Sequence, residues 1–356
     1  MSEILPLTAL RGWLALWVVL FHLSPLIGPS LSPLTSVGDV AVDVFFLLSG
    51  FVIALNYSER LERSAAPLRD YASFLKARWA RIYPVHAAHQ LAWLLLVCGA
   101  TALGRAGITW DQLDPISFVR ALLLVQAWGT PMQMTWNYPS WSVSLEWLAY
   151  LAAPALLALP RIAARIQAGR LASCLALWLL LLAAHQKPWE HLARIASEFT
   201  AGAHLAAWHR AGNIRVLQTL ASLRWLLATS FVALLLLTAA EHQHGLALPL
   251  AAAALLGFAQ SKSAPAWQVY CGRISYSLYI AHALAITLLH QVVPPQESPP
   301  ILAAYLVGIY TLGAATYHVI ERPAQRLLTG THARHVPDPA APPIAAPAVL
   351  ELTGRR

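Results

Sequence analysis

Cysteine and charged residues are scarce in this 356-residue chain, and each scarcity excludes a class of protein. The three cysteines, Cys98, Cys174 and Cys271, lie far apart in hydrophobic stretches, so we expect buried thiols and neither a disulfide framework nor a metal site. Charged residues make up only 11% of the chain and hydrophobic residues 58%. A soluble domain could not bury that much apolar surface, so the composition indicates a membrane protein.

Apolar segments of about 15 to 23 residues recur along the chain, and a transmembrane helix needs about 20 residues. We therefore predict an all-α, polytopic membrane bundle of about ten transmembrane helices. The first segment lacks a basic leader and a small-residue cleavage site, so we expect it to be retained. The ten expected spans are 7–27, 38–56, 83–104, 140–159, 171–186, 193–209, 224–240, 246–260, 272–293 and 300–320.

Two other segments have helical character but are not expected to cross the membrane. Segment 116–128 is too short, and we expect an interfacial or re-entrant helix there. Segment 59–81 is amphipathic and carries charges of both signs, which is typical of a helix on the membrane surface. Residues 329–356 are rich in proline and alanine and are expected to form a disordered tail, so residues 1–328 make up the predicted membrane domain.

Lysine and arginine set the expected orientation. With the N-terminus in the cytoplasm, 19 of the 24 Lys and Arg residues fall in or beside cytoplasmic connections. The positive-inside rule therefore places both termini in the cytoplasm, and the inner membrane is the expected location if the host is bacterial. The net charge of +8 is spread between apolar segments rather than gathered in one patch, so no nucleic-acid partner is expected.

Ionisable residues inside apolar spans are costly and therefore candidates for function. Arg11 and His22 share the first span, and an eleven-residue separation places them on one helix face about 16 Å apart. His22, Asp43 and Glu146 lie five or six residues from the expected outer ends of their spans, so a base and two carboxylates are expected at one depth. For His22 a packed ring bonded to a backbone carbonyl is the alternative, and for Asp43 a turn at the membrane interface.

A second polar layer is expected near the cytoplasmic side. Arg11, Arg78 and Arg81 suit phosphate groups there, or alternatively lipid headgroups. Ser49 and Gly50 lie near the bilayer centre, where small residues admit a neighbouring helix or a thin ligand. The remaining polar candidates are Ser275, Tyr276, Tyr279 and His282 in the inner half of one span, Glu321 with Arg322 as an ion pair, and Glu198, His204, His86 and His89 without an assigned role.

Six motifs along the chain together resemble the acyltransferase 3 family of integral membrane O-acyltransferases. They are LRGWLALWVVLFH (10–22), DVFFLLSGFVIA (43–54), RWARIYP (78–84), SWSVSLEW (140–147), RISYSLYIAH (273–282) and IERP (320–323). The resemblance implies transfer of an acyl group, usually acetyl from acetyl-CoA, to a hydroxyl of a glycan, another cell-envelope acceptor or a small molecule.

The resemblance also implies roles for individual residues. His22 matches the essential histidine of the family, and Arg11 matches its paired arginine. Arg78 and Arg81 match a motif associated with the acyl-CoA donor. Ser49, Gly50 and Phe51 match a Ser-Gly-Phe motif. Trp13 departs from the smaller residues that are commoner at its position.

Two routes fit these residues, and neither needs a metal. Neutral His22 acts as a general base towards the acceptor hydroxyl, with Glu146 or Asp43 orienting the ring, or His22 itself takes the acyl group. Ser49 or Tyr276 could stabilise the developing oxyanion. Alternative functions are a proton-coupled secondary transporter, a glycan-binding membrane scaffold and a hydrolase. The acceptor, the acyl length and the oligomeric state stay open.

Overall fold

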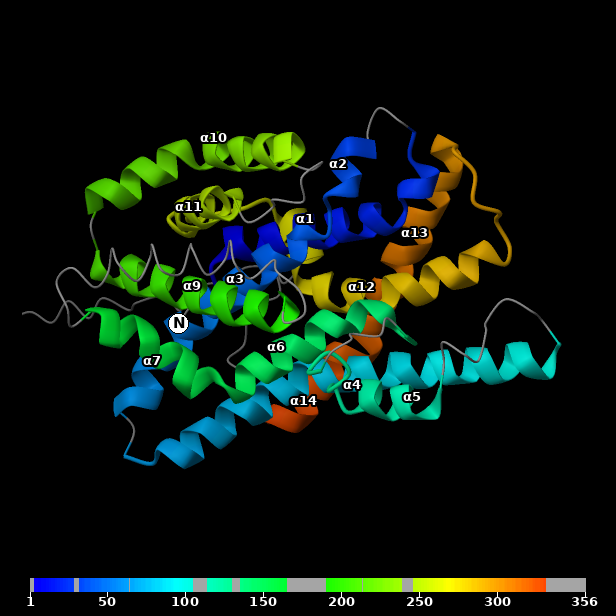
Figure 1. Ribbon diagram of the computed structural model, residues 1–356, viewed down its shortest axis with the longest axis horizontal. Helices are drawn as coiled ribbons and strands as arrows, with labels where there is room; N and C mark the ends of the chain where they lie inside the picture. The colour runs from blue at the N-terminus through cyan, green and yellow to red at the C-terminus, as the bar shows by residue number, and fades with distance from the viewer. Residues whose placement is uncertain are drawn as a thin grey trace, which may run out of the picture.

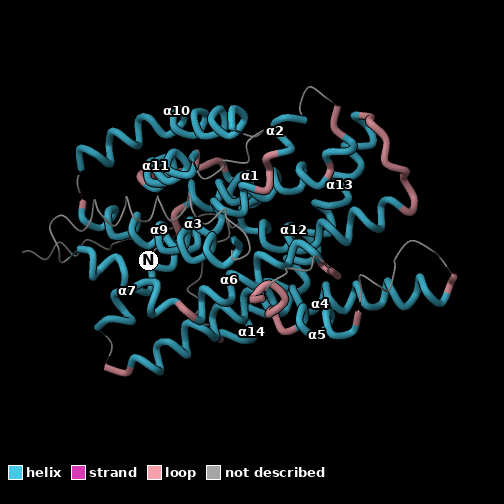
Figure 2. The backbone as a smooth tube through the Cα atoms, viewed as in Figure 1, coloured by secondary structure: helices cyan, strands magenta, loops and turns pink. Residues whose placement is uncertain are grey.

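The computed structural model describes residues 3–28, 32–63, 65–104, 114–129, 135–164, 190–212, 214–238 and 246–330. In these ranges the regular structure consists of helices, and no strand occurs (Figures 1 and 2). The predicted all-α class is confirmed. The predicted span at 171–186, the tail from residue 331 and Cys174 lie outside the described residues.

Five described helices are long and apolar enough to cross a membrane. They are Leu5–His22, Val40–Ser58, Pro67–Ala102, Arg215–Thr238 and Pro299–Thr329, and Leu248–Ala259 is a shorter apolar helix. The count of ten spans stays a prediction.

Several expected spans differ in extent from the helices that form. In chain order the helices are α1 (Leu5–His22), η1 (Ser24–Leu26), α2 (Ser32–Ser36), α3 (Val40–Arg63), α4 (Pro67–Ala102), α5 (Pro115–Leu122), η3 (Tyr138–Ser140), α6 (Trp141–Leu151), α7 (Ala153–Ala164), α9 (Glu190–Ala211), α10 (Ile214–Thr238), α11 (Leu248–Ala259), α12 (Ala266–His290), α13 (Pro299–Thr316), η6 (Tyr317–Glu321) and α14 (Arg322–Thr329).

The amphipathic segment 59–81 is not a separate surface helix. Its first residues complete α3, and the rest form the first half of the 36-residue α4, which continues past Pro84. The expected span 140–159 is divided instead, because α6 ends at Leu151 and α7 restarts two residues later with Pro154 in its first turn. Proline lacks the backbone N–H that would continue the earlier helix, but it is well tolerated in the first turn of a new one.

Glycine allows two pairs of helices to approach closely. A Cβ on Gly50 of α3 would lie 2.0 Å from the Phe199 carbonyl oxygen of α9, and one on Gly202 would lie 2.0 Å from the Leu47 carbonyl oxygen. At the crossing of α1 and α12, a Cβ on Gly272 would lie 1.7 Å from the Thr8 carbonyl oxygen. Small residues at such crossings let helix backbones touch inside a membrane. These two crossings position α1 and α3, which carry Arg11, His22, Asp43 and Ser49.

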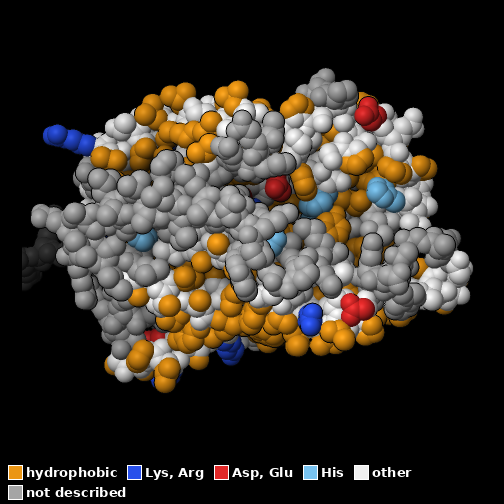
Figure 3. All heavy atoms as spheres, viewed as in Figure 1, with side chains coloured by type: hydrophobic (Ala, Val, Ile, Leu, Met, Phe, Trp, Pro, Cys, Tyr) orange, Lys and Arg blue, Asp and Glu red, His pale blue; other side chains and the backbone are white. Residues whose placement is uncertain are grey.

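The described surface is rich in hydrophobic side chains, as Figure 3 shows for one face. Leu95 of α4 is 73% exposed and Leu237 of α10 is 80% exposed. A water-soluble protein rarely leaves so many large apolar side chains uncovered, whereas lipid tails would cover them. Cys98 is also exposed and Cys271 is half-buried, so the prediction of buried thiols was wrong for Cys98.

Candidate active site

A small cavity of about 50 Å³, partly open to the surroundings, lies where α1, α3, α6 and α12 meet. Its polar lining includes Arg11 from α1, Ser49 from α3, Glu146 from α6 and Tyr276 from α12. Four of the candidate residues, from segments far apart in the chain, therefore share one cavity. Gly50 does not line it, because Gly50 faces α9 at the helix crossing.

Glu146 is the acceptor for two hydroxyl groups. Its Oε1 accepts a hydrogen bond of 2.6 Å from the Ser49 hydroxyl and another from the Tyr150 hydroxyl, one turn further along α6. Arg11 lies within electrostatic range of Glu146 and Tyr150. This carboxylate is thus held in place by donors from two helices and faces a guanidinium group.

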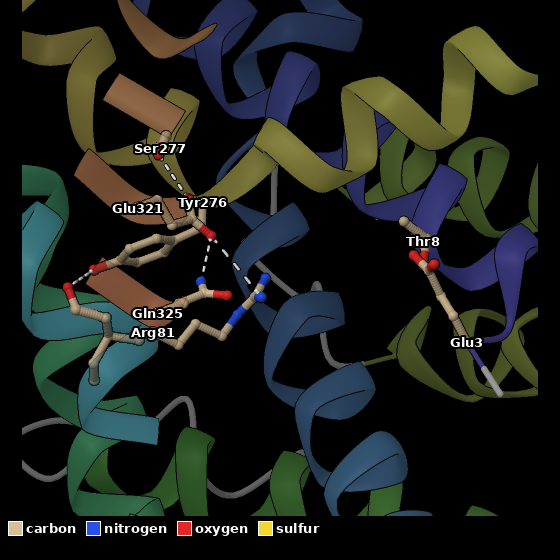
Figure 4. Close-up of polar contacts among 8 residues, drawn as sticks. Glu3, Thr8, Arg81, Tyr276, Ser277, Glu321 and Gln325 are labelled. Carbon is tan, nitrogen blue, oxygen red and sulfur yellow. Dashed lines mark hydrogen bonds and ion pairs between the residues drawn. The ribbon is translucent and has the colours of Figure 1, made fainter. Parts of the chain in front are cut away.

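A second carboxylate, Glu321, contacts side chains from three other helices (Figure 4). Glu321 is 1% exposed and ends the π-helical turn η6. Its oxygens accept hydrogen bonds from Ser277 (2.6 Å) and Gln325 (3.1 Å), and Arg81 Nη1 lies 3.9 Å away. The predicted pair with Arg322 was wrong. The wider π turn changes the direction in which a helix points its side chains, and here Glu321 reaches α4 and α12 instead.

The three predicted arginines, Arg11, Arg78 and Arg81, lie near one another around Glu146 and Tyr150, and we call them the arginine layer. Arg11 lies within electrostatic range of Arg81, and Arg81 in turn within range of Glu146 and Glu321. The Arg78 guanidinium lies 3.5 Å from the Tyr57 hydroxyl and 5.6 Å from the centre of its ring. The Nε atoms of Arg11 and Arg78 are buried without a hydrogen-bond partner in the described part of the chain. The layer therefore has donors to spare for an anionic ligand.

Tyr276 stands between the cavity and this arginine layer. It lines the cavity, and its hydroxyl donates a 2.5 Å hydrogen bond to the backbone carbonyl of Ile82 on α4 (Figure 4). This hydrogen bond joins α12 to α4 next to Arg81, and it occupies the hydroxyl proton of Tyr276.

His22 is the last residue of α1 and lies at the other end of that helix from Arg11. Its Nδ1 is 2.9 Å from the Val18 carbonyl oxygen, so Nδ1 carries the proton in the neutral ring and Nε2 keeps its lone pair. The ring centre lies 5.3 Å from that of Tyr138 and 4.9 Å from that of His282. The backbone contact matches the alternative expected for a packed histidine, yet it leaves a basic nitrogen free.

Asp43 belongs to a different group. It is fully buried, and Arg194 of α9 donates to its Oδ1 from Nε at 2.9 Å and from a second nitrogen. Glu198, one turn after Arg194, lies close to the same carboxylate. Between the described residues no hydrogen bond or ion pair joins His22 to Asp43 or Glu146. The catalytic roles of the two carboxylates stay predictions.

The unassigned histidines contact nearby helices. His86 Nε2 lies 2.7 Å from the Ala121 carbonyl oxygen of α5, and His89 Nε2 lies 3.2 Å from the Thr316 hydroxyl of α13. His204 Nδ1 is 3.0 Å from the Thr200 carbonyl oxygen one turn earlier. His86 and His89 thus connect α4 to two neighbours.

Two residues beside the candidates carried too little signal in the sequence, and one candidate lies elsewhere than expected. Tyr150 and Tyr138 are ordinary aromatic residues of membrane helices until Glu146 and His22 lie next to them. His282 was expected in the inner half of its span, but α12 begins six residues earlier than the expected span, and the ring lies beside His22 instead. The described residues contain no cluster of three or more side chains that could hold a metal ion.

Comparison with known proteins gives one family and two relatives. A family model described as "Acyltransferase domain" matches residues 5–319. "Acyltransferase MdmB" of Streptomyces mycarofaciens is 35% identical over 158 residues, which cover 42% of this chain and 38% of that protein. "Protein 2 in picA locus" of Rhizobium radiobacter is 35% identical over 152 residues, or 40% of this chain and 72% of that protein. No solved structure matches.

Proposed function

Because the chain belongs to the acyltransferase 3 family, we propose that it is a membrane-embedded O-acyltransferase that moves an acyl group from acyl-CoA to an acceptor hydroxyl. Acetyl is the proposed acyl group. The acceptor belongs to a glycan, another cell-envelope molecule or a small molecule. In a bacterial host the enzyme spans the inner membrane several times, with both termini in the cytoplasm.

One observation carries this proposal: the first half of α1 presents Arg11 to a polar cavity, and the helix ends in a histidine whose Nε2 keeps its lone pair. Arg11 and His22 are eleven residues apart, which corresponds to about 16 Å along the helix. Acyl-CoA has the same two-part character, with phosphates at one end and a reactive thioester at the end of a long thin arm. A donor bound along α1 would place its phosphates near Arg11 and its thioester near His22.

The arginines suit the phosphate end of the donor. Guanidinium groups bind phosphate oxygens with two parallel hydrogen bonds and stay charged in a poorly hydrated site. Arg81 is fixed by Glu321, while Arg11 and Arg78 each keep a buried Nε without a partner among the described residues. We assign these three residues to the donor, with Ser49 and Tyr276 beside the path of the arm.

His22 supplies the base. Its Nε2 accepts the proton of the acceptor hydroxyl as that oxygen attacks the thioester carbonyl carbon. When the C–S bond breaks, the CoA thiolate leaves and takes this proton from the imidazolium, so His22 returns to its neutral form. The Val18 carbonyl keeps Nδ1 protonated throughout, which orients the ring without a carboxylate. In the second route Nε2 attacks the thioester and takes the acyl group as CoA leaves. The acceptor hydroxyl then attacks the acyl group on Nε2, which frees the ring, and the hydroxyl proton passes to the CoA thiolate.

The test uses membranes that contain the wild type, His22→Ala or His290→Ala at matched levels, supplied with acetyl-CoA labelled in the acetyl group. His290 ends α12 with an exposed side chain, so its variant controls for the loss of a histidine. We expect alkali-labile label in the wild type and in His290→Ala. Loss of a general base typically slows a reaction by about 10² to 10⁴-fold, so His22→Ala should incorporate almost none.

The labelled fraction identifies the acceptor class, whether glycan, small molecule or protein. If the wild type neither transfers label nor binds acetyl-CoA, the donor assignment fails. Proton flux that depends on a substrate and not on acyl-CoA would then favour the secondary transporter.

A further inference from the structure

Four buried side chains, on α4, on α12 and just before η3, have polar atoms without hydrogen-bond partners among the described residues. They are Nε2 of His282, Oδ1 of Asn137, both amide atoms of Gln90 and Nε1 of Trp93. The first three residues are fully buried and Trp93 is 7% exposed. More than nine in ten buried polar groups in proteins are hydrogen-bonded, so such a concentration in one place requires an explanation.

Asn137 and Trp93 contact the turn of α12 that carries His282. Asn137 Nδ2 donates a 3.0 Å hydrogen bond to the Ile280 carbonyl oxygen. Trp93 packs in a cluster with Ala283 and Leu284, which directly follow His282. Gln90 lies three residues before Trp93 on α4 and therefore on the same helix face.

The same turn reaches the reactive ring. The rings of His282 and His22 have centres 4.9 Å apart, and Tyr138, which follows Asn137, lies 5.3 Å from His22. His282 and Asn137 therefore lie beside the base, and the packing of Trp93 on the same turn brings the face of α4 that carries Gln90 towards that turn.

The free atoms have a definite chemical character. His282 Nδ1 lies 2.6 Å from the Tyr279 carbonyl oxygen and so carries the ring proton, which leaves Nε2 as an acceptor. Asn137 uses its amide N–H on Ile280, which leaves Oδ1 as an acceptor. Gln90 offers one donor group and one acceptor, and Trp93 offers one N–H donor. The four residues thus offer unpaired acceptors and unpaired N–H donors together, and aromatic rings lie beside them.

A ligand with several O–H groups close together fits this mixture of donors and acceptors. A hydroxyl donates one hydrogen bond and also accepts, so adjacent hydroxyls can satisfy Nε2, Oδ1 and the Gln90 amide together. An isolated alcohol would satisfy His22 and leave the other buried groups unpaired, which is unfavourable.

We propose that His282 and Asn137, with Gln90 and Trp93, form the acceptor subsite, and that it binds a polyol unit whose neighbouring hydroxyls flank the one to be acylated. This rests on the proposed O-acyl transfer. His22 acts on the reacting hydroxyl, while His282 and Asn137 hold the adjacent ones and select acceptors that have them.

The first experiment measures binding without any chemistry. The full chain, labelled with ¹⁵N in its histidines and placed in nanodiscs, is titrated with trans-cyclohexane-1,2-diol or with cyclohexanol, which have the same ring. The His282 Nε2 resonance is assigned by its loss in His282→Phe. We expect the diol to shift this resonance and cyclohexanol to shift it several-fold less at the same concentration. Equal effects of the two alcohols, or no effect of either, would overturn the subsite.

The second experiment measures transfer of acetyl from acetyl-CoA to the same two alcohols. We expect the wild type to prefer the diol at least tenfold, because a site built for a hydroxyl discriminates strongly against its absence. His282→Phe keeps the ring but loses the acceptor nitrogen, and it should reduce the preference to near one, as should Asn137→Leu. His282→Gln, which restores an acceptor oxygen near the Nε2 position, should recover most of it, and His290→Phe should leave it unchanged. Preference retained in both His282→Phe and Asn137→Leu would contradict the proposal.

Acetyl-CoA binding, measured with labelled donor, separates this proposal from the proposed function. If the wild type binds no acetyl-CoA while the diol still shifts His282 selectively, the donor assignment fails and the polyol subsite stands. If the donor binds and is consumed but the diol has no advantage, the subsite fails and the O-acyltransferase stands.

Discussion

The two ends of α1 carry polar groups of opposite kinds. Around Arg11 the groups are charged, and Glu146 and Glu321 are held by hydroxyl, amide and guanidinium donors from several helices. Around His22 the groups are neutral rings and amides, and His282 and Asn137 keep unpaired atoms. At the charged end the carboxylates are thus held by the protein's own donors while Arg11 and Arg78 keep buried N–H groups for an anion, whereas the unpaired atoms at the neutral end belong to uncharged side chains.

This contrast suits a transferase with one constant and one selected substrate. A preorganised charged site binds the same phosphates in every cycle, and the arginines need little rearrangement. An uncharged site that depends on the hydroxyls of its ligand discriminates by what that ligand offers. Variants that affect one end and leave the other unchanged test whether the two ends act independently.

The largest effect is expected from Gly272→Ala, which disturbs both ends together. The added Cβ would lie 1.7 Å from the Thr8 carbonyl oxygen, so α1 and α12 would have to separate. We expect a loss of about 3 kcal/mol or more in the free energy of unfolding, since overpacking against a backbone is hard to relieve. Thermal unfolding in detergent measures it. Gly99→Ala in α4 is the control, because nothing lies within 4 Å of its added Cβ. Equal stability of the two variants would refute a close crossing.

A smaller and one-sided effect is expected from Arg81→Lys. Lysine keeps the charge but loses the planar pair of donors that suits phosphate. We expect KM for acetyl-CoA to rise about tenfold, in line with a lost charged hydrogen bond, while kcat and the diol preference stay within twofold. Steady-state kinetics with each substrate varied in turn measures both. A change in diol preference as large as the change in KM would show that the two ends are not independent.

The smallest effect is expected from Ser49→Ala, which removes the 2.6 Å hydrogen bond to Glu146 and leaves the Tyr150 bond in place. We expect a loss of about 1 kcal/mol in the free energy of unfolding and less than a tenfold change in rate. The adjacent Gly50→Ala is the contrast, because its Cβ would lie 2.0 Å from the Phe199 carbonyl oxygen. If Ser49→Ala is the more damaging of the two, the cavity matters more to the fold than the helix crossing does.

Much of this site could be predicted because its residues stand in recognisable motifs. Arg11, Ser49, Glu146 and Tyr276 were identified from the sequence, and all four line one cavity. Other contacts could not be predicted. Counting residues from the ends of spans gives the depth of a side chain but not the direction in which it points. That is why Asp43 was expected with His22 and instead bonds to Arg194 of α9.

The amino-acid sequence alone was enough to identify the class of protein and the separation of Arg11 and His22 along α1. The composition excludes a water-soluble domain. The helical rise places Arg11 and His22 about 16 Å apart on one face of their helix, whatever surrounds it. Which side chains lie around Arg11 and around His22 depends on how the helices pack against one another. His282 reaches His22 because α12 packs closely on α1 at the Gly272 crossing, and Glu146 reaches Ser49 because α6 lies beside α3. Those contacts join residues more than 90 positions apart, and local spacing along one helix carries no information about the rotation of another.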